Sequence, residues 1–416
     1  MVPNGWSEGR VGDLLDGLES GVSVNGEDRH FSSNEKAVLK VSAVTYGSFN
    51  PFAAKVIDIE ELDRATTNPK QGQVIISRSN TESLVGASAY IERDYPNLFL
   101  PDKLWQTVPK ANADMKWLSY ILASSHVRYM LSNLATGTSG SMKNITKGEL
   151  LGLKILIPPS VEQKKISQTL STWDKAISTA EQLLTNSQQQ KKALMQQLLT
   201  GKKRLRDNNG VRFSGEWQQC IIEDFFDVGS SKRVLQDDWK NEGTPFYRTR
   251  ELVSLSKNEP FRSEVFIADE LFHELSIKYG APKPGDFLVS GVGTLGISYQ
   301  VKDGDRFYFK DGNVLWFKIK EGLFSDYFKY CFQSDFLQEQ IVAQASITTV
   351  GTYTIQNAKK TKFWCPPSIA EQQKISAVLS TADQEIAALQ QKLDALKQEK
   401  MALMQQLLTG KKRVIV

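Results

Sequence analysis

The sequence has little cysteine and little histidine. Its 416 residues include only three of each. The cysteines, Cys220, Cys331 and Cys365, are far apart and form no CxxC pair. An odd number of scattered cysteines argues against a disulfide framework, and the missing CxxC and His spacings argue against a structural zinc site. We expect no metal ion on this chain.

Long apolar runs are also missing. No stretch approaches the roughly 18 apolar residues of a membrane-spanning helix, and the start, MVPNGWSEGR, lacks the apolar stretch of a signal peptide. The composition, 40% hydrophobic and 24% charged, is that of a globular protein with room for two or more domains. The net charge of +4 is only mildly compatible with nucleic acid. We expect a cytoplasmic protein with no membrane partner.

Convincing catalytic motifs are absent as well. Gly291–Gly296 matches GxGxxG, but the residues that follow predict a strand where a dinucleotide or methyl-donor site needs a helix. Thr200-Gly-Lys-Lys resembles half of a P-loop but ends a predicted helix. Asn50-Pro-Phe52 lacks the second proline of adenine methyltransferases. We expect neither catalytic residues nor a cofactor on this chain.

What the sequence does contain is a long internal repeat. ALMQQLLTGKKR occurs at 193–204 and again at 402–413. Upstream landmarks recur as Glu162/Glu371, Asp174/Asp383 and, more weakly, Trp6/Trp217. A whole-chain repeat defines the fold before any local pattern does. It predicts a divergent half followed by a well-kept half, twice, with boundaries at 1–157, 158–204, 205–364 and 365–416.

Each well-kept half predicts one long helix. Ser160-x-x-Gln163 and Ser368-x-x-Glu371 have the spacing of capping boxes, and Gly201 and Gly410 stand where a helix ends. No proline or glycine lies between these signals. A span of roughly 38 residues would be about 57 Å long.

The apolar residues of both predicted helices follow a heptad spacing of 4 and 3, which indicates a coiled coil. A polar residue interrupts both seams at the same place, Lys191 and Lys400. It either sets the register or extends its ammonium from the seam edge. We expect the helices to form an antiparallel pair with a pseudo-two-fold axis. The seam residues are Ile166, Leu170, Ile177, Leu184, Leu194, Leu198, Ile375, Leu379, Ile386, Leu389, Leu393, Leu396, Leu403 and Leu407.

The divergent halves predict two α+β domains. Short β-branched and aromatic runs such as QVIISRS and NVLWFKI are typical of strands. Met115–Leu131 and Phe324–Ile341 each predict one amphipathic helix. The fold class is therefore α+β, with two globular domains alternating with two long paired helices.

Basic and polar residues cluster in predicted loops of both domains. These residue types contact phosphates and base edges in DNA, although any one such loop is more commonly just solvated. The Lys-Lys-Arg runs after the helices are better explained as helix-end charges. Our DNA-binding candidates are Arg78, Lys143, Asn144, Lys232, Arg233, Arg248 and Arg250.

With these residues in view, the chain resembles the specificity subunit of type I restriction–modification enzymes over its whole length. Shared motifs are the Val2-Pro-x-x-Trp6 start, Pro-Pro-x-x-Glu-Gln-x-x-Ile before each helix, Leu-Leu-Thr-Gly-Lys after it, and the restart Phe213-Ser-Gly-Glu-Trp217. Ala370 lengthens the second Pro-Pro motif by one residue.

The resemblance implies a function that the sequence patterns by themselves do not predict. Each divergent domain would read one half of a split double-stranded DNA target, and the helices would set the gap and bind two modification subunits. Those subunits would use S-adenosylmethionine, and restriction subunits would use ATP and Mg. The chain itself would be non-catalytic.

Two other classes were weighed. A fused adenine methyltransferase would need a methyl-donor glycine motif and Asn-Pro-Pro-aromatic, and the sequence has neither. A protein-binding coiled-coil scaffold fits the helices but leaves two unlike domains with Arg-rich loops unexplained. Whether a restriction subunit accompanies this chain stays open.

Overall fold

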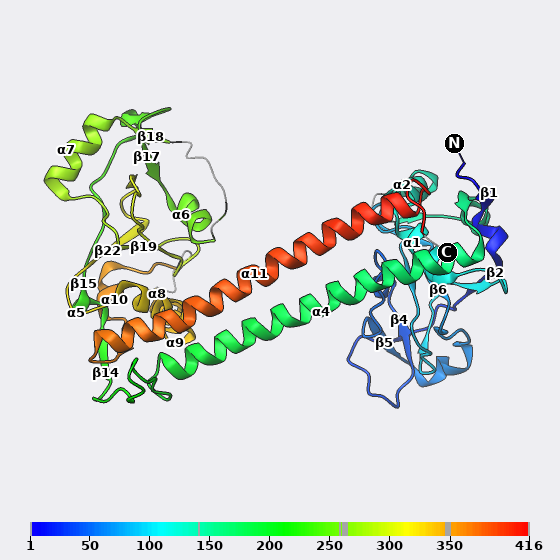
Figure 1. The fold of residues 1–416 in the computed structure, drawn as a ribbon, viewed down its shortest axis with the longest axis horizontal. Helices are drawn as coiled ribbons and strands as arrows, with labels where there is room; N and C mark the ends of the chain where they lie inside the picture. Colours follow the sequence, from blue (N-terminus) through cyan, green and yellow to red (C-terminus); the bar gives the residue numbers. More distant parts are fainter. Residues whose placement is uncertain (1, 140–141, 258, 260–264, 346–350, 415–416) are drawn as a thin grey trace. The chain divides into compact units, whose positions relative to one another are not determined.

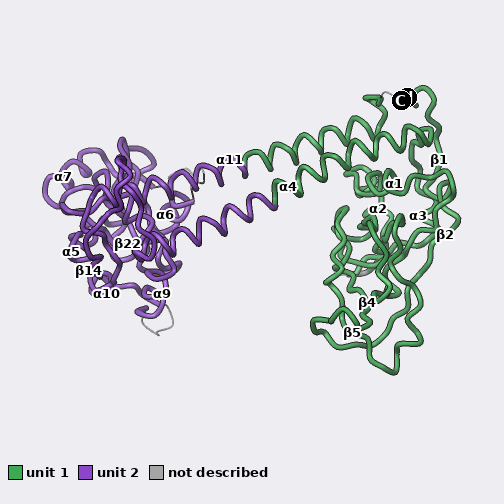
Figure 2. The backbone as a smooth tube through the Cα atoms, turned by 60° about the horizontal axis from the view of Figure 1, so that its bottom comes forward, with its two compact units in different colours: residues 1–181, 391–416 green, residues 182–390 purple. Residues whose placement is uncertain are grey.

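In a computed structural model, the chain folds as two compact units (Figures 1 and 2). The structure describes residues 2–139, 142–257, 259, 265–345 and 351–414. Unit 1 consists of residues 1–181 and 391–416, and unit 2 of residues 182–390. Each unit therefore combines one mixed domain with a segment of both long helices, α4 (Ser160–Leu198) and α11 (Ile369–Leu407).

The domain of unit 1 contains two four-stranded sheets, in the orders β2-β10-β6-β8 and β3-β5-β4-β9. The first is antiparallel, and in the second the β4–β9 pair is parallel. Strand β6, an inner strand of the first sheet with the sequence VIIS, is buried throughout, as expected for an apolar β-branched run. The strands are β2 (Leu15–Ser20), β3 (Gly26–Glu27), β4 (Ala37–Leu39), β5 (Ala54–Ile57), β6 (Val74–Ser77), β8 (Ser88–Tyr90), β9 (Leu98–Phe99) and β10 (Leu104–Pro109).

Unit 2 repeats this topology with the orders β15-β22-β19-β20 and β16-β18-β17-β21, again with one parallel pair, β17–β21. The GxGxxG stretch joins β19 to β20 as an antiparallel hairpin, as the sequence predicted. The strands are β15 (Phe226–Gly229), β16 (Trp239–Lys240), β17 (Thr244–Tyr247), β18 (Phe266–Ile267), β19 (Phe287–Ser290), β20 (Ser298–Gln300), β21 (Tyr308–Phe309) and β22 (Val314–Ile319).

A two-stranded antiparallel sheet opens and closes each domain: β1 (Ser7–Arg10) pairs with β13 (Lys154–Ile157), and β14 (Gln218–Ile221) pairs with β23 (Lys362–Cys365). The strand that leads into each long helix is therefore hydrogen-bonded to the strand that begins the same domain. Short helices complete the units. They are α3 (Lys147–Leu151), α5 (Ile222–Phe225), α6 (Thr249–Ser256), α7 (Asp269–Tyr279), α10 (Ile355–Lys360) and the 3₁₀ turns at Val11–Leu14, Val41–Ala43, Ile59–Arg64 and Gln236–Asp238.

The two predicted amphipathic helices are each broken in two, so the prediction of single helices was wrong. Met115–Leu131 forms α1 (Met115–Ala123) and α2 (Ser125–Leu134), and the second segment forms α8 (Ser325–Gln333) and α9 (Asp335–Gln344). Ser124 and Ser334 are extended at the breaks, and each hydroxyl accepts a backbone N–H of the following helix. A serine that caps a new helix in this way competes with continuation of the old one.

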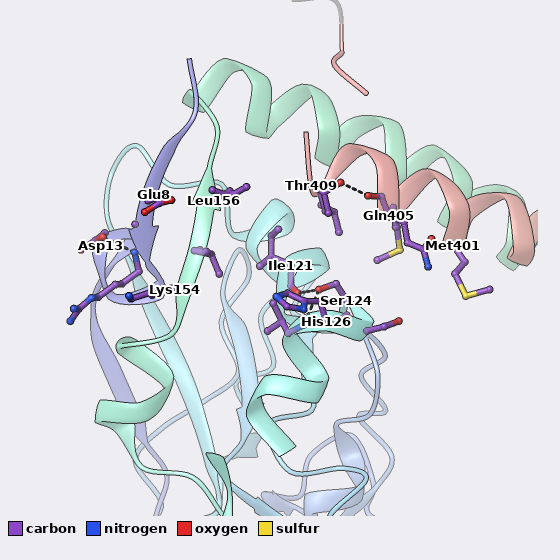
Figure 3. Close-up of a pocket in the computed structure, with 18 residues that line it drawn as sticks. Glu8, Asp13, Ile121, Ser124, His126, Lys154, Leu156, Met401, Gln405 and Thr409 are labelled. Carbon is purple, nitrogen blue, oxygen red and sulfur yellow. Dashed lines mark hydrogen bonds between the residues drawn. The ribbon is translucent and has the colours of Figure 1, made fainter. Parts of the chain in front are cut away.

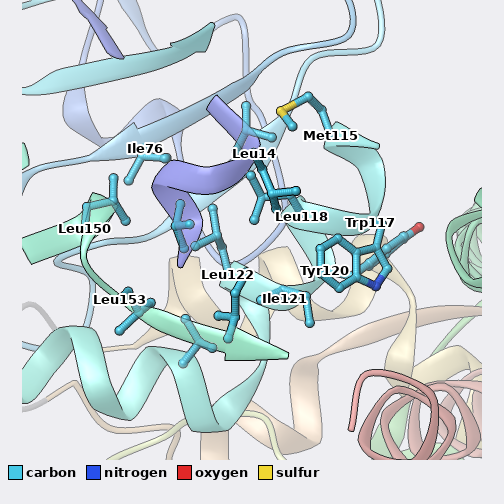
Figure 4. Packing of buried hydrophobic residues seen from close by; sticks show 14 of the residues in the cluster. Leu14, Ile76, Met115, Trp117, Leu118, Tyr120, Ile121, Leu122, Leu150 and Leu153 are labelled. Atoms are coloured by element: carbon cyan, nitrogen blue, oxygen red, sulfur yellow. The ribbon is translucent and has the colours of Figure 1, made fainter. Parts of the chain in front are cut away.

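The core of unit 1 joins the domain to both long helices. Trp117, Leu118 and Leu122 of α1 are fully buried against the sheet (Figure 4). The same cluster contains Ile166 of α4 and Leu407 of α11. Complete burial of such a side chain contributes about 1.5–3 kcal/mol, so the helix segments are held as part of the domain core.

Unit 2 has the equivalent core with more aromatic residues. Phe226 packs against Phe287, Phe317 and Phe328, with ring centroids 4.4–6.0 Å apart. Leu198 of α4, and Ile375 and Leu379 of α11, belong to this cluster. Aromatic pairs at these distances add to the free energy gained from burial.

Each long helix has 39 residues and begins and ends close to the predicted positions. The chain leaves α4 through Gly201 (φ +70°) and α11 through Gly410 (φ +67°), a backbone conformation that favours glycine. The side chains predicted to close the capping boxes make other contacts. Gln163 donates to the Pro158 carbonyl (2.9 Å) and accepts the Asp114 backbone N–H (3.1 Å), and Glu371 binds Arg204.

The helix segments within each unit run antiparallel. In unit 1, Asp174 of α4 pairs with Lys400 of α11, and Glu181 pairs with Lys397. Residue numbers therefore increase along α4 in the direction in which they decrease along α11. In unit 2, Lys191 of α4 pairs with Asp383 of α11. The predicted antiparallel pairing is confirmed in both units.

Candidate nucleic-acid interface

The first group of DNA-binding candidates lies on one small sheet of unit 1. Strands β11 (Thr136–Ser139), β12 (Met142–Asn144) and β7 (Ser79–Asn80) form this sheet, in which Lys143 pairs with Asn80. Arg78 directly precedes β7, and its carbonyl accepts the N–H of Ile145 (2.9 Å). The structure therefore brings Arg78, Lys143 and Asn144 onto two neighbouring strands.

Arg78 is the member of this group with the most unused hydrogen-bonding capacity. Its Nη2 atom is 3.8 Å from the Asp102 carboxylate, and both side chains are 41% exposed. Its Nε atom is buried and has no acceptor among the described residues. Lys143, in contrast, donates to the Gly137 carbonyl (3.2 Å). Because the buried Nε is out of reach of a ligand, the exposed part of the guanidinium is what suits a guanine edge or a phosphate.

The second group comes from two segments of unit 2 that border the same strand, β21. The backbone N–H of Lys232 donates to the Tyr308 hydroxyl (3.1 Å), and its ammonium stands 5.3 Å from the ring centroid of Tyr279. Arg233 beside it is exposed. Strand β17 ends on the other side of β21, at Tyr247, directly before Arg248.

Arg248 and Arg250 both bind the buried carboxylate of Glu251, in the first turn of α6. Burial by itself would raise the pKa of Glu251, but hydrogen bonds from Arg248 and from the backbone outweigh burial and lower it. The Arg248 side chain is only 26% exposed, and its ion pair with Glu251 stabilises the start of α6. Arg250 is 61% exposed and stays accessible to a ligand.

The seam residues predicted for the helix pair all have reduced exposure. Ile166, Leu170, Leu198, Ile375, Leu379, Leu393 and Leu407 are buried. The other seven are half-buried, namely Ile177, Leu184, Leu194, Ile386, Leu389, Leu396 and Leu403. Leu183, one position off the seam, is 49% exposed. The heptad pattern therefore coincides with the side of each helix that faces protein.

The two seam lysines make matching contacts in the two units. Lys400 pairs with Asp174, which also accepts the Tyr120 hydroxyl. Lys191 pairs with Asp383, which accepts the Tyr330 hydroxyl (2.8 Å). Burial and this hydrogen bond raise the pKa of each tyrosine, so both hydroxyls stay protonated. Each lysine thus links the two helices and the adjoining domain, which supports the register role.

A second repeated contact ties the end of each long helix to the start of the other. Arg204, after α4, binds Glu371 at the start of α11 (2.6 Å), and Arg413, after α11, binds Glu162 at the start of α4 (2.7 Å). Each guanidinium also lies 5.9 Å from the ring centroid of a tryptophan, Trp217 or Trp6. We call each of these groups a latch.

The latches explain part of the twelve-residue repeat. A Cβ on Gly201 would come within 2.9 Å of the Trp217 ring, and one on Gly410 within 2.4 Å of Pro3. Glycine is therefore required at both places, and each arginine is the ion-pair partner of a buried glutamate. Sequence reasoning treated these arginines as helix-end charges and missed their partners. The sequence did contain a signal for these ion pairs, because Glu162 and Glu371 recur at equivalent positions of the same repeat.

Comparison with known proteins agrees with this duplicated architecture. The family model for the type I restriction modification DNA specificity domain matches residues 3–186 and again 214–398. The chain belongs to this family. The two matches cover both domains and most of both long helices of this specificity-family chain.

Curated relatives carry specificity-subunit names. The chain is 32% identical over 156 residues to a putative type I restriction enzyme specificity subunit, S.HindORF215P, of Haemophilus influenzae, covering 36% of each chain. It is 24% identical to the EcoEI specificity subunit of Escherichia coli, covering 45% of this chain and 32% of that protein. These matches span about a third of either relative. A putative MjaX specificity subunit of Methanocaldococcus jannaschii is 22% identical over 99% of this chain and 95% of its own.

Solved structures share the fold of this family member. The S subunit of a type I restriction–modification system from M. genitalium aligns over 98% of this chain and 99% of its own, with a TM-score of 0.58 and 16% identity. A chain from a study of complex assembly in a type I R-M system aligns over 99% and 100%, with a TM-score of 0.58 and 18% identity.

The described residues contain neither a membrane-spanning helix nor a cluster of metal-ligating side chains. None of their helices is both long and apolar enough to cross a membrane. None of their His, Cys, Asp and Glu side chains gather in threes as a metal site would require.

Proposed function

We propose that this chain is the DNA-recognition subunit of a type I restriction–modification complex. Each domain reads one half of a split, asymmetric double-stranded target, with Arg78 as the first base-reading candidate in unit 1 and Arg250 in unit 2. The observation that carries the proposal is the duplication itself: a family-specific unit occurs twice, with similar helices but unlike basic loops. Two different readers on one repeated frame suit a target with two different halves.

The helices serve as the spacer and as the docking sites for two modification subunits. The chain performs no catalysis and acts in the cytoplasm. The modification subunits supply S-adenosylmethionine chemistry on adenine, and restriction subunits supply ATP- and Mg-dependent translocation and cleavage. Half-sites about 34–36 Å apart, one DNA turn, would present the same face of the duplex to a pseudo-two-fold reader.

Mapping of methylated adenines tests this function directly. The chain is co-expressed with its cognate modification subunit, and methylated adenines are located genome-wide by single-molecule sequencing. We expect one split motif with two short defined halves and a constant gap. An assembled complex that leaves no motif would contradict the DNA-reading proposal.

A further inference from the structure

Two grooves occupy the same place in the two units. Groove 1 has a volume of about 1200 Å³ and lies between the end of α11, the turn from α1 to α2, and β13 (Figure 3). Groove 2 has a volume of about 430 Å³ and lies between the end of α4, the turn from α8 to α9, and β23. Neither groove contains a residue of our DNA-binding candidates.

Most of the helix residues that line the two grooves come from the twelve-residue repeat. Met404, Gln405 and Thr409 line groove 1, and Met195, Gln196 and Thr200 line groove 2. Both glutamines are exposed. The latches account for the glycine and arginine of the repeat, and the cores for its paired leucines, but neither accounts for identical exposed side chains. Four identical helix side chains in each groove, in two otherwise divergent units, indicate one common occupant.

The lysines beside the grooves are the charges that both units keep, and they indicate what that occupant carries. Groove 1 is also lined by Glu8 and Arg10, which unit 2 replaces with Gln219 and Ile221, and by Asp13, which accepts the Arg10 backbone N–H (2.7 Å). Lys154 lines groove 1 and Lys202 lines groove 2, and the repeat places Lys411 and Lys362 at the corresponding positions of the other unit. All four lysines are exposed, and no described carboxylate lies within ion-pair distance of them. The groove walls also contain methionine, leucine and isoleucine or phenylalanine, which suit apolar side chains better than a phosphate backbone.

We propose that each groove binds the same segment of a modification subunit, one copy per groove, and that groove 1 binds it more tightly. Apolar side chains of this segment enter the groove, and its acidic residues pair with the flanking lysines. This inference rests on the proposed function, because that function supplies the partner. It adds where the two copies dock and why the two sites are unequal.

The equivalent wall positions differ at seven places, and four of these substitutions explain the inequality. Met401 and Ser125 in groove 1 correspond to Lys192 and Asp335 in groove 2, which form an ion pair of 3.0 Å. The remaining two changes also place a larger side chain in groove 2: His126 becomes Phe336 and Leu156 becomes Trp364. An occupant of groove 2 must displace the ion pair and enter a smaller space.

The test measures binding of the purified modification subunit to the full chain by native mass spectrometry and by titration. Gln405→Glu places a negative charge in groove 1, and Gln196→Glu does the same in groove 2. We expect each variant to weaken one of the two binding steps by about tenfold or more, through repulsion of the acidic segment. The double variant should bind no partner at the concentrations used.

Neighbouring glutamines provide matched controls. Gln406→Glu and Gln197→Glu add the same charge on the same exposed helix turns outside the grooves. Both should bind two partners as the wild-type chain does. Conversely, Lys192→Met with Asp335→Ser gives groove 2 the residues of groove 1 at these two positions. This variant should tighten the weaker step by up to about fivefold, because no exposed ion pair has to be displaced.

The outcomes separate this inference from the proposed function. If the wild-type chain binds two partners but Gln405→Glu and Gln196→Glu bind them equally well, the grooves are not the docking sites and the DNA-reading function still stands. If these variants lose DNA affinity while partner binding is unchanged, the grooves face DNA and the inference is overturned. If the wild-type chain binds no modification subunit, the proposed function fails first.

Discussion

At the scale of single residues, the most consequential contact is the latch between Arg204 and Glu371. The Glu371 side chain is fully buried and that of Arg204 is 15% exposed. A buried charge is tolerated only while its partner remains, because the low-dielectric surroundings penalise an unpaired ion. The other latch differs, since Arg413 is 43% exposed and Glu162 also accepts the Trp6 indole N–H (3.0 Å).

Glu371→Gln should therefore lower the free energy of unfolding by about 3 kcal/mol, because it leaves the Arg204 guanidinium without a counter-charge. Chemical denaturation of the full chain measures this change. Glu162→Gln should cost less, since Arg413 is open to water and the amide oxygen can still accept from Trp6. Glu385→Gln, at an exposed site on α11, is the control. Equal losses in Glu371→Gln and Glu385→Gln would refute the latch.

Arg78→Ala should weaken DNA binding of the assembled complex by about 1–3 kcal/mol and relax the preference for one base pair. The physical reason is the loss of a guanidinium that is 41% exposed and only loosely paired with Asp102 (3.8 Å). Fluorescence anisotropy on duplexes with single base changes measures both effects. Arg64→Ala removes an exposed arginine that pairs with Glu61 in the same domain and should change neither. A uniform loss across all duplexes would assign Arg78 to a phosphate instead.

Acid should weaken the start of α6 through Glu251. The folded-state pKa of Glu251 is lowered, so its stabilising contribution is present above the unfolded-state pKa and is lost as the pH falls through the folded-state value. Glu251→Gln should abolish that part of the pH dependence while leaving the unfolding free energy nearly insensitive to acid at this site. Denaturation of both proteins from neutral to acidic pH tests this, and parallel pH profiles would contradict it.

At the scale of elements, the long helices show which sequence signals were sufficient. The heptad spacing, the glycine exits and the absence of proline and glycine placed both helices close to their observed bounds. The bounds of the shorter helices were harder to predict, because Ser124 and Ser334, where the helices break, lie inside continuous amphipathic patterns. Only the hydroxyl hydrogen bonds that start α2 and α9 reveal the breaks, and a serine in a helical pattern makes such bonds only sometimes.

Deletion of one heptad tests the helices as a spacer. Removing residues 184–190 alone should change or abolish the preferred gap, because the pairs on either side, Glu181–Lys397 and Lys191–Asp383, can no longer both form. Removing 184–190 and 386–392 together keeps both ion pairs in register and should shorten the gap by about 10 Å, or about three base pairs. Methylation mapping of each variant gives the gap. An unchanged gap in the double deletion would disprove the spacer role.

At the scale of the whole molecule, the proposed function gives each of the two duplicated domains a separate half of the DNA target. Arg78→Ala and Arg250→Ala should therefore relax different halves of the methylated motif, with the opposite half unchanged in each case. Genome-wide methylation maps of the two variants show this directly. Lys240→Ala, an exposed lysine of unit 2, should leave both halves intact. Relaxation of the same half by both arginine variants would contradict independent reading.

The sequence by itself determined the repeat, the long helices, their seam and the α+β class of the domains. These depend on local spacing and on burial of apolar faces, which leave a periodic record along the chain. It also placed candidate basic residues in both domains, because arginine and lysine are recognisable by type. It did not distinguish the weakly paired Arg78 from Arg248, whose guanidinium binds Glu251.

Only the tertiary structure decided what the repeated residues contact. The latches join residues 167 and 251 positions apart, and the grooves join a helix end to a turn and a strand from distant parts of the chain. A repeat shows that a residue is kept twice but not which neighbour needs it. Electrostatic pairing and groove shape depend on distances in space, and these are set only when the segments pack together.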